Sequence, residues 1–359
     1  MNGPILIMAG GTGGHVFPAL AVAERLRGMG HEVRWMGTRN GIEARVVPDA
    51  GIGIDWLSVQ GLRGKGRLTL LLAPLRLLRA CGQALMILRR RRPVAVLGMG
   101  GFASGPGGLM ARVLRIPLVI HEQNAIPGLT NRLLARLARR VFCAFPQARA
   151  TWPSAEVVGN PVRAAIAALP DPETRYSARG DAPLRVLVVG GSLGARRLNQ
   201  VLPAALALID AERRPQLRHQ CGPRLEAECR EDYARHGVEA EILPFIDDMA
   251  AAYAWADLVI CRSGALTVSE IAAAGVASLL VPYPHAVDDH QFHNARFLAE
   301  AGAAEVCRDA ALTPQWLAEY LQHHGDRESL KIRAGKARAC AIIDADRRVA
   351  QALIEEAQA

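Results

Sequence analysis

The chain has 359 residues, of which 50% are hydrophobic, and a formal net charge of +9. This length and composition are sufficient for two ordinary α/β domains, or less simply for one large domain, and they exclude a disordered or fibrous protein. The seven cysteines are scattered, odd in number and never spaced as CxxC, which argues against a disulfide framework or a structural zinc site. We therefore predict reduced, buried thiols.

The N-terminus runs from residues 2–4 directly into the apolar residues 5–8, with no basic leader and no cleavage site. This pattern predicts a first strand rather than a secretory signal, so we expect the protein to stay in the cytoplasm. The longest hydrophobic stretch, residues 68–88, is interrupted by Pro74, Arg76, Arg79 and Gln83. Those interruptions argue against a helix that crosses a membrane.

The basic residues are distributed unevenly, and a large group of them lies in the first half of the chain. They include Arg63, Lys65, Arg67, Arg76, Arg79, the run Arg89 to Arg92, Arg112, Arg115, Arg132, Arg136, Arg139 and Arg140. Positive charge favours phosphates, nucleic acid or acidic lipid headgroups as partners, and the sign of the charge does not choose among them. The stretch 68–88 with its cationic flanks suits the surface of an anionic leaflet, and it equally suits a core helix with a solvated basic end.

Short apolar runs alternate with helical periodicity along the chain, for example residues 5–8 followed by 16–29, and residues 94–97 followed by 109–114. Such alternation predicts parallel sheets joined by right-handed crossovers. The pattern restarts near residue 184, with a strand over 185–189 and a helix over 195–209. We predict an α/β protein of two Rossmann-like domains whose parallel sheets face an interdomain cleft.

The domain boundary is expected near residues 159–163. We assign residues 1–163 to the N-terminal domain and residues 164–340 to the C-terminal domain. The segment 344–357 is amphipathic and can pack back on the first domain as part of a C-terminal helix over about residues 341–359.

Three glycine-rich turns follow predicted strands, at residues 10–14, 98–106 and 190–194. Glycines there allow the backbone to approach a ligand closely, and the start of the following helix attracts a diphosphate or a transition-state charge. Plain packing is the alternative for each turn. The first turn does not fit a dinucleotide fingerprint, because counting GxGxxG from Gly11 requires glycine at Val16, and no loop carries a Walker lysine.

Several polar side chains lie at predicted strand ends. His15, at the tip of the first turn, can act as a general base, although a lone histidine often has a structural role. Residues 121–124, His-Glu-Gln-Asn, follow an apolar strand and bind a ligand or cap a helix. Glu270, early in a predicted helix, can accept ribose hydroxyls or complement the helix dipole.

The segment 285–294 places His290 and His293 on one helix face, which at first suggests a metal site. Because helix starts and glycine turns already supply positive charge, we predict no metal and no cofactor. We instead assign Gln291 and its neighbours to recognition of sugar hydroxyls.

Taken together, GGTGGHVFPALAVA, GGFASGP, HEQNAIPGLTNR, GNPVR, GGSLGAR, RSGALTVSE and DDHQFHNA occur in one order over residues 10–295. In this order they closely resemble the lipid I N-acetylglucosaminyltransferases of peptidoglycan synthesis, which are GT-B glycosyltransferases. The resemblance implies that the C-terminal domain holds UDP-N-acetylglucosamine. It also implies that the N-terminal domain receives the undecaprenyl-linked lipid I at an anionic inner leaflet.

The resemblance also implies roles for particular residues. His15 is the expected base, Glu270 holds the ribose, Ile246 contacts the uracil through its backbone and Gln291 contacts the sugar hydroxyls. The full set of expected nucleotide-sugar contacts is Thr12, Gly13, Gly14, Asn124, Arg163, Ser192, Ile246, Ala265, Leu266, Thr267, Val268, Ser269, Glu270 and Gln291. On the acceptor or diphosphate side we expect Gly100, Gly101, Ser104, His121 and Glu122.

Three positions depart from the family pattern: Leu193 and His290 stand where glutamine is found, and Phe102 stands where tyrosine is frequent. Phe102 has no phenolic hydroxyl, so that group has no catalytic part here.

The reaction implied is transfer of N-acetylglucosamine to the 4-hydroxyl of the muramyl sugar of lipid I, with inversion to a β-1,4 linkage. It implies a peripheral protein on the cytoplasmic face of the inner membrane. Another GT-B enzyme, such as a UDP-N-acetylglucosamine 2-epimerase or a glycolipid synthase, is the nearest alternative. A basic nucleic-acid-binding protein is a further one, but the sequence has no basic-aromatic interleaving and no recognised module, so we expect no nucleic-acid partner.

Overall fold

The computed structural model describes residues 3–59, 73–180, 182–191 and 194–359. Contacts within the chain divide it into two compact units, residues 1–163 with 342–359 (unit 1) and residues 164–341 (unit 2). Each unit contains one sheet, and every pairing between neighbouring strands in both sheets is parallel.

The sheet of unit 1 has seven strands in the order β3-β2-β1-β4-β5-β6-β7. The central strand β1 is completely apolar and at most 1% exposed, as expected for a parallel strand covered on both faces. The strands are β1 (Ile5–Met8), β2 (Val33–Gly37), β3 (Ile54–Trp56), β4 (Ala95–Gly98), β5 (Leu118–Glu122), β6 (Arg140–Cys143) and β7 (Glu156–Val157).

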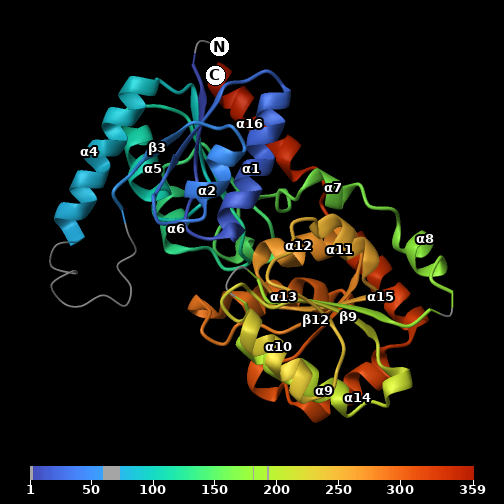
Figure 1. Ribbon diagram of the computed structural model, residues 1–359. Coiled ribbons are helices and arrows are strands. Elements are labelled where there is room, and N and C mark those ends of the chain that lie inside the picture. The colour runs from blue at the N-terminus through green and yellow to red at the C-terminus, as the bar shows by residue number, and fades with distance from the viewer. Residues whose placement is uncertain (1–2, 60–72, 181, 192–193) are drawn as a thin grey trace. The chain divides into compact units, whose positions relative to one another are not determined.

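Helices connect these strands and cover the sheet. They are α1 (Gly13–Gly28), α2 (Glu43–Asp49), α4 (Ala73–Arg91), α5 (Ser104–Val113) and α6 (Leu129–Leu134), with a 3-10 turn η1 (Pro146–Ala150). The last helix of the chain, α16 (Ala345–Gln358), also belongs to unit 1 and packs beside α1 (Figure 1). Its buried side chains join the core formed by α1 and the strands, so the two ends of the chain complete one unit.

The sheet of unit 2 has six strands in the order β10-β9-β8-β11-β12-β13. These are β8 (Arg185–Val189), β9 (Gln216–Gln220), β10 (Glu241–Leu243), β11 (Leu258–Cys261), β12 (Ala277–Leu280) and β13 (Ala304–Val306). The helices are α7 (Ala164–Ala167), α8 (Pro172–Ser177), α9 (Arg196–Ala207), α10 (Glu226–Arg235), α11 (Met249–Trp255), α12 (Ala265–Ala274), α13 (His290–Glu300), α14 (Pro314–His324) and α15 (Arg327–Ala339). The 3-10 turns are η2 (Ala211–Arg213), η3 (Val287–Asp289) and η4 (Asp309–Ala311).

Both sheets reverse the direction of strand order beside their first strand, between β1 and β4 in unit 1 and between β8 and β11 in unit 2. In open α/β sheets, ligands bind at the carboxyl ends of the strands at such a switch point. All three glycine-rich turns follow one of these four strands. The topology therefore singles out one candidate binding edge in each unit.

Local sequence patterns located most elements but misplaced some ends. The helix expected over 16–29 begins at Gly13, and the one expected over 109–114 begins at Ser104, because glycines and prolines in the first turns hide the start of the apolar periodicity. All seven cysteines are free, but Cys81 and Cys340 are partly exposed, which corrects the prediction of buried thiols at these two positions.

Among the helices of the described residues, none has both the length and the apolar composition needed to cross a bilayer. Helix α4 accounts for residues 73–88 of the hydrophobic stretch, and residues 68–72 lie outside the described part of the chain.

Candidate functional site

The first glycine-rich turn connects β1 to α1 at the switch point of unit 1. Thr12 is the extended residue before the helix, and the amides of His15 and Val16 bond to its carbonyl oxygen at 3.1 and 3.3 Å. The amides of Gly13 and Gly14, in the first turn of α1, have no carbonyl one turn earlier within the helix to accept from them. They are therefore suited to bind an anion.

The amide of Gly11 is already used within the protein. It donates to Oε2 of Glu43 at 2.9 Å, and the other carboxylate oxygen accepts from the amide and the hydroxyl of Thr38 at 3.0 and 2.7 Å. Glu43 is fully buried. This carboxylate holds the first turn in shape, and it occupies the amide of Gly11.

The turn after β4 lies against the first turn. Gly100 and Gly101 have φ values of +91° and +81°, which favour glycine. A Cβ atom on Gly101 would lie 2.3 Å from the carbonyl oxygen of Gly10, and a Cβ on Gly100 would lie 3.0 Å from Nδ1 of His15. Glycine is required at both positions because backbone and imidazole come this close.

His15 is partly exposed and lies in the first turn of α1. Its Nδ1 is 2.8 Å from Oε1 of Gln123, a side chain that is 1% exposed at the end of β5. Gln123 thus holds the ring through Nδ1, and Gly100 lies beside it. The other ring nitrogen, Nε2, is the polar atom left for a ligand.

Three of the predicted acceptor-side residues are buried side chains whose polar atoms already have protein partners. Ser104 bonds through its hydroxyl to the carbonyl oxygens of Met8 and Gly100 at 2.9 and 2.7 Å. His121 is fully buried with Nε2 2.8 Å from the carbonyl oxygen of Gly159, and burial lowers the pKa of His121 to about 4. Its ring is therefore neutral at physiological pH.

Glu122 is 1% exposed and organises the loop after β5. Its carboxylate accepts from the amide and the side-chain Nδ2 of Asn124 at 2.9 and 3.1 Å, from the amide of Gly128 at 3.1 Å and from Nδ2 of Asn131 at 2.9 Å. Asn124 remains partly exposed. In unit 1, the guanidinium of Arg163 lies 6.0 Å from the centre of the Phe17 ring, so it is held near α1.

In unit 2, the turn after β8 has the same construction. Gln220 holds it, because its Oε1 accepts from the amide of Gly191 at 3.0 Å and its Nε2 donates to the carbonyl of Gly191 at 3.1 Å. A Cβ atom on Gly194 would lie 2.2 Å from the carbonyl oxygen of Cys221. Ser192 and Leu193, both singled out from the sequence, lie outside the described residues.

The second strand at this switch point, β11, leads into α12, which begins with Ala265 directly after the extended Gly264. Leu266, Thr267 and Ser269 are partly exposed, whereas Ala265, Val268 and Glu270 are buried. The Ser269 hydroxyl bonds to the carbonyl of Ala265 at 3.0 Å. Glu270 is 4% exposed, and its Oε2 accepts from the hydroxyl of the fully buried Tyr253 at 3.2 Å.

Two further predicted contacts lie on neighbouring loops of unit 2. Ile246 follows β10 and is 9% exposed, so its backbone is the part more suited to a ligand. Gln291, in the first turn of α13, accepts from the amide of Tyr283 at 2.9 Å through Oε1. That bond leaves the Nε2 end as the donor for a ligand.

His290 uses Nδ1 in a 2.8 Å contact with the carbonyl oxygen of Val287. In the described part of the chain, no three His, Cys, Asp or Glu side chains are grouped so that they could hold a metal ion.

Family models match both units. The glycosyltransferase family 28 N-terminal domain matches residues 5–143, and the glycosyltransferase family 28 C-terminal domain matches residues 185–348. The chain belongs to glycosyltransferase family 28. Its fold is therefore GT-B, which confirms the fold class expected from the two parallel sheets and the motif order.

Two curated relatives of this family 28 glycosyltransferase are named "UDP-N-acetylglucosamine--N-acetylmuramyl-(pentapeptide) pyrophosphoryl-undecaprenol N-acetylglucosamine transferase". The protein of Ralstonia nicotianae is 54% identical over 99% of this chain and 97% of its own length. The protein of Cupriavidus metallidurans is 55% identical over 97% of this chain and 96% of its own. The crystal structure of Acinetobacter baumannii MurG is similar with a TM-score of 0.83 and 42% identity, covering 98% of this chain and 99% of that one.

Sequence reasoning missed four residues that shape these sites in the family 28 glycosyltransferase: Glu43, Gln123, Asn131 and Tyr253. Gln123 and Asn131 lie inside the motif HEQNAIPGLTNR. The motif pointed to this loop, but it did not show that these two side chains shape the site. Glu43 and Tyr253 had no signal, because each lies in a helix outside the glycine-rich turns and is joined to the site only by folding.

Proposed function

We propose that this family 28 glycosyltransferase transfers N-acetylglucosamine from UDP-N-acetylglucosamine to the 4-hydroxyl of the muramyl sugar of lipid I. The product is the β-1,4-linked lipid II of peptidoglycan synthesis. The observation that carries the proposal is the identity of 54% over 99% of the chain with a relative whose name states this donor and this acceptor. Two family 28 domains and the glycine-rich turns at both switch points agree with it.

The nucleotide sugar is assigned first to unit 2. There the start of α12 can offer backbone amides to a diphosphate, and the buried Glu270 lies in the second turn of α12 with its carboxylate held by Tyr253. We assign the ribose to Glu270, the uracil to the backbone of Ile246 and the sugar hydroxyls to Gln291. Ser192 and residues 265–269 complete this set, with Thr12, Gly13, Gly14, Asn124 and Arg163 as contacts from unit 1.

The base is assigned to His15. Its imidazole takes the proton of the muramyl 4-hydroxyl, the oxygen attacks the anomeric carbon and the bond to UDP breaks on the opposite face. One displacement of this kind inverts the anomeric configuration, and the negative charge leaves with UDP. Backbone amides at helix starts stabilise that charge in the transition state.

The acceptor is assigned to the turn after β4. Gly100 adjoins His15 and Gly101 adjoins the backbone of Gly10, so these two glycines are the part of this turn that we assign to the muramyl sugar or its diphosphate. Ser104, His121 and Glu122 act behind this surface, since their side chains are buried and bonded to the protein.

The lipid part of the acceptor requires a membrane, and unit 1 has a surface suited to one. Helix α4 buries Ala80, Ala84, Ile87 and Leu88, which recur with helical spacing on one face. Large apolar side chains elsewhere on α4, α5 and α6 remain exposed, among them Leu75, Leu78, Met86, Val113, Leu129 and Leu133. We call these six side chains the apolar patch.

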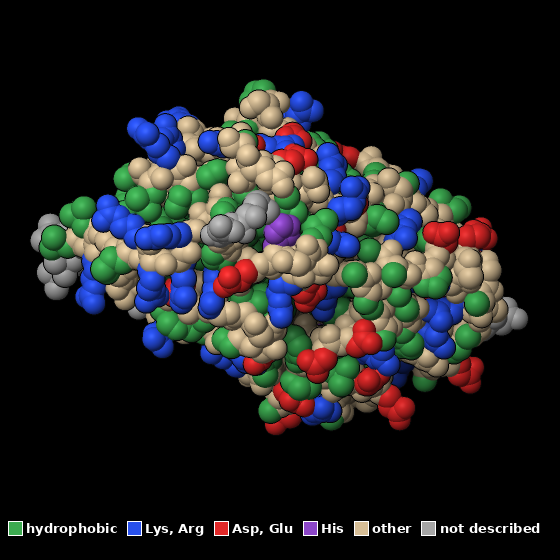
Figure 2. Space-filling view, turned by 90° about the horizontal axis from the view of Figure 1, so that it is seen from above, with side chains coloured by type: hydrophobic (Ala, Val, Ile, Leu, Met, Phe, Trp, Pro, Cys, Tyr) green, Lys and Arg blue, Asp and Glu red, His purple; other side chains and the backbone are tan. Residues whose placement is uncertain are grey.

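Exposed arginines lie on the same helices as the apolar patch: Arg76 and Arg79 on α4, Arg112 on α5 and Arg132 on α6. Figure 2 shows hydrophobic and basic side chains interspersed at the end of unit 1 that carries α4. Apolar contact combined with positive charge favours an anionic bilayer surface. We therefore assign the protein to the cytoplasmic face of the inner membrane, as a peripheral protein.

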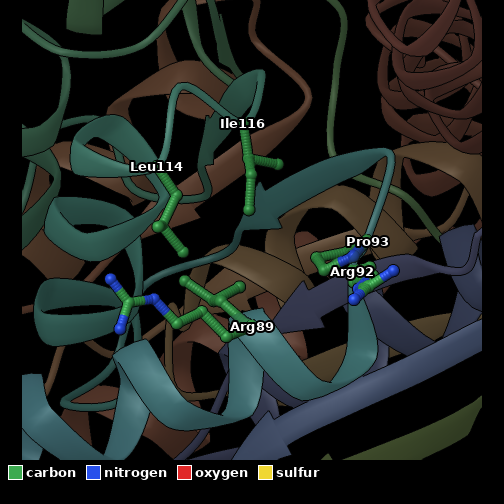
Figure 3. A pocket seen from close by; sticks show the side chains of 6 residues that line it. Arg89, Arg92, Pro93, Leu114 and Ile116 are labelled. Carbon is green, nitrogen blue, oxygen red and sulfur yellow. The ribbon is translucent and has the colours of Figure 1, made fainter.

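Not all of the basic run at the end of α4 is available to a membrane. Asp55 accepts from Arg90 at 2.7 Å and from Arg91 at 2.8 Å, which neutralises part of the charge. Arg89 and Arg92 instead line a shallow pocket with Leu88, Pro93, Leu114 and Ile116 (Figure 3). These two guanidinium groups are the ones we assign to lipid phosphates.

The transfer reaction is tested by incubating the full chain with labelled UDP-N-acetylglucosamine and a lipid I analogue, with and without a chelator. We expect label in the lipid product under both conditions, because amides rather than a metal stabilise the leaving diphosphate. A reaction without lipid I controls for hydrolysis of the donor. Absence of labelled lipid contradicts the substrate assignment, and loss of transfer only with the chelator contradicts the metal-free departure of UDP.

A further inference from the structure

A row of hydrogen bonds runs behind His15 into the core of unit 1. Nδ1 of His15 lies 2.8 Å from Oε1 of Gln123. Nε2 of Gln123 lies 3.2 Å from the carbonyl oxygen of His121 and 3.3 Å from Nδ1 of the same residue. Nε2 of His121 lies 2.8 Å from the carbonyl oxygen of Gly159. The row thus starts at the partly exposed imidazole and ends at a backbone carbonyl.

Two carbonyl oxygens, those of His121 and Gly159, determine which atoms in this row donate. A carbonyl only accepts, so the end of the Gln123 amide near the His121 carbonyl is its NH₂ group, and its oxygen faces His15. That oxygen also only accepts, so Nδ1 of His15 must carry the hydrogen. By the same reasoning Nε2 of His121 donates to Gly159, and its Nδ1 is free to accept from Gln123.

Every donor in the row therefore meets an acceptor, and the assignment has no conflict. The middle of the row is closed to water, because His121 is fully buried and Gln123 is 1% exposed. Burial lowers the pKa of His121 to about 4, so its ring is neutral and keeps the lone pair on Nδ1 that the row requires. Gly100 lies close to the ring, since a Cβ atom there would be 3.0 Å from Nδ1 of His15.

We propose that Gln123 is a positioning residue that fixes His15 as the Nδ1–H tautomer and so leaves Nε2 as the atom that accepts the proton. This inference rests on the proposed function, in which His15 is the base. In the other tautomer the lone pairs of Nδ1 and Oε1 would face each other, and the Gln123 oxygen would lose its donor. A base with its lone pair on the wrong nitrogen cannot take the proton, so the tautomer controls the reactive fraction of the enzyme.

The tautomer is measured directly by long-range ¹H–¹⁵N NMR of the histidine rings in the ¹⁵N-labelled full chain at a pH at which the His15 ring is neutral. The His15 signals are assigned as those lost in His15→Gln. We expect a protonated Nδ1 and an unprotonated Nε2 in the unchanged protein. In Gln123→Leu, which fills similar space without polar atoms, we expect His15 to become a mixture of both tautomers.

The same variants give a kinetic reading. We expect Gln123→Leu to lower kcat about tenfold or more while KM for UDP-N-acetylglucosamine changes less than about threefold. Gln123→Glu retains an oxygen that accepts from Nδ1, so it should keep the tautomer. Gln200→Leu, an exposed change on α9, is the matched control and should alter neither reading.

An Nε2–H tautomer in the unchanged protein overturns the inference, and so does an unaltered His15 tautomer in Gln123→Leu. If Gln123→Leu does not fold, Gln123→Glu serves in its place. Loss of the His15 Nδ1–H signal in Gln123→Glu would then overturn the inference. The NMR measurement needs no substrate, so failure of transfer to lipid I contradicts the proposed function while leaving the tautomer result standing.

Discussion

The carboxylate of Glu43 is fully buried, yet it accepts hydrogen bonds from the amides of Gly11 and Thr38 and from the Thr38 hydroxyl. A buried carboxylate is costly unless such donors surround it. Here they hold the first glycine-rich turn in the shape that brings Gly10 against Gly101 and His15 against Gly100. The geometry around the proposed base therefore depends on a buried carboxylate of another helix, α2.

At the residue scale, the role of His15 is open to a direct test. Replacement by alanine removes the proton acceptor but none of the unit 2 contacts assigned to the donor. We expect turnover to fall at least about a hundredfold. Binding of UDP-N-acetylglucosamine, measured by calorimetry, should remain nearly unchanged.

The control for this substitution is His323→Ala, an exposed histidine at the end of α14. It should retain full activity. Near-normal turnover in His15→Ala would remove His15 as the base.

Two buried histidines make stability depend on pH. Burial lowers the pKa of His121 to about 4 and that of His219 to about 3, whereas the unfolded chain binds these protons near the ordinary value of 6.5. Stability from the neutral rings is therefore complete above about pH 6.5 and is lost as the pH falls toward the folded-state values. Within that range, each ring should lower the free energy of unfolding by about 1.4 kcal/mol for every unit by which the pH falls.

The measurement is urea unfolding at several pH values between about 7.5 and 4.5, for the unchanged chain and for His121→Gln. Glutamine can still donate to the Gly159 carbonyl but does not titrate. The difference in the free energy of unfolding between the two proteins should stay constant above about pH 6.5 and shrink below it, by about 1.4 kcal/mol per unit. Parallel curves for the two proteins would show that His121 does not cause the dependence.

At the scale of elements, α16 shows which interactions attach the end of the chain to unit 1. Ion pairs join it to the rest of the unit, including Arg25 with Asp346 at 2.8 Å and Arg140 with Glu355 at 3.0 Å. Exposed pairs of this kind contribute about 0 to 1 kcal/mol each. The buried side chains Val349 and Leu353 contribute more, since burying one such side chain is worth about 1.5–3 kcal/mol.

Replacing Leu353 by alanine should therefore lower the free energy of unfolding by about 2–5 kcal/mol, because it removes transfer energy and leaves a cavity beside α1. The matched control is Gln351→Ala on the exposed face of the same helix, where the change should stay within about 0.5 kcal/mol. Denaturant unfolding measures both. Equal stability of the two variants would mean that α16 is not packed as the structure has it.

At the scale of the whole molecule, arginines from the first half of the sequence lie exposed on unit 1. The arginines near the apolar patch should draw the protein to anionic bilayers, each adding about 1 kcal/mol near the surface. The double change Arg76→Gln with Arg79→Gln should then weaken partitioning into anionic vesicles about thirtyfold, since it removes about 2 kcal/mol.

Vesicle flotation with and without acidic lipid measures this partitioning. Arg213→Gln with Arg224→Gln, which removes the same charge from exposed positions of unit 2, is the control and should have a much smaller effect. Equal losses in both double variants would indicate a response to net charge rather than a membrane-binding surface on unit 1.

The sequence by itself determined the features that depend on near neighbours along the chain. Apolar runs followed by helical periodicity predicted the parallel sheets, and glycines directly after the strands predicted the turns at both switch points. The order of the motifs identified the family. These predictions are confirmed because strand burial and tight turns are local properties that a few consecutive residues fix.

Only the tertiary structure decided how distant residues meet. Gln123 reaches His15 across 108 positions, Glu43 reaches Gly11 across 32, and α16 returns to α1 from the other end of the chain. No local sequence pattern predicts such contacts. Each depends on which strands become neighbours in the sheet and on distances set by the packed core. The candidate base was therefore visible in the sequence, while the groups that orient it became visible only in the fold.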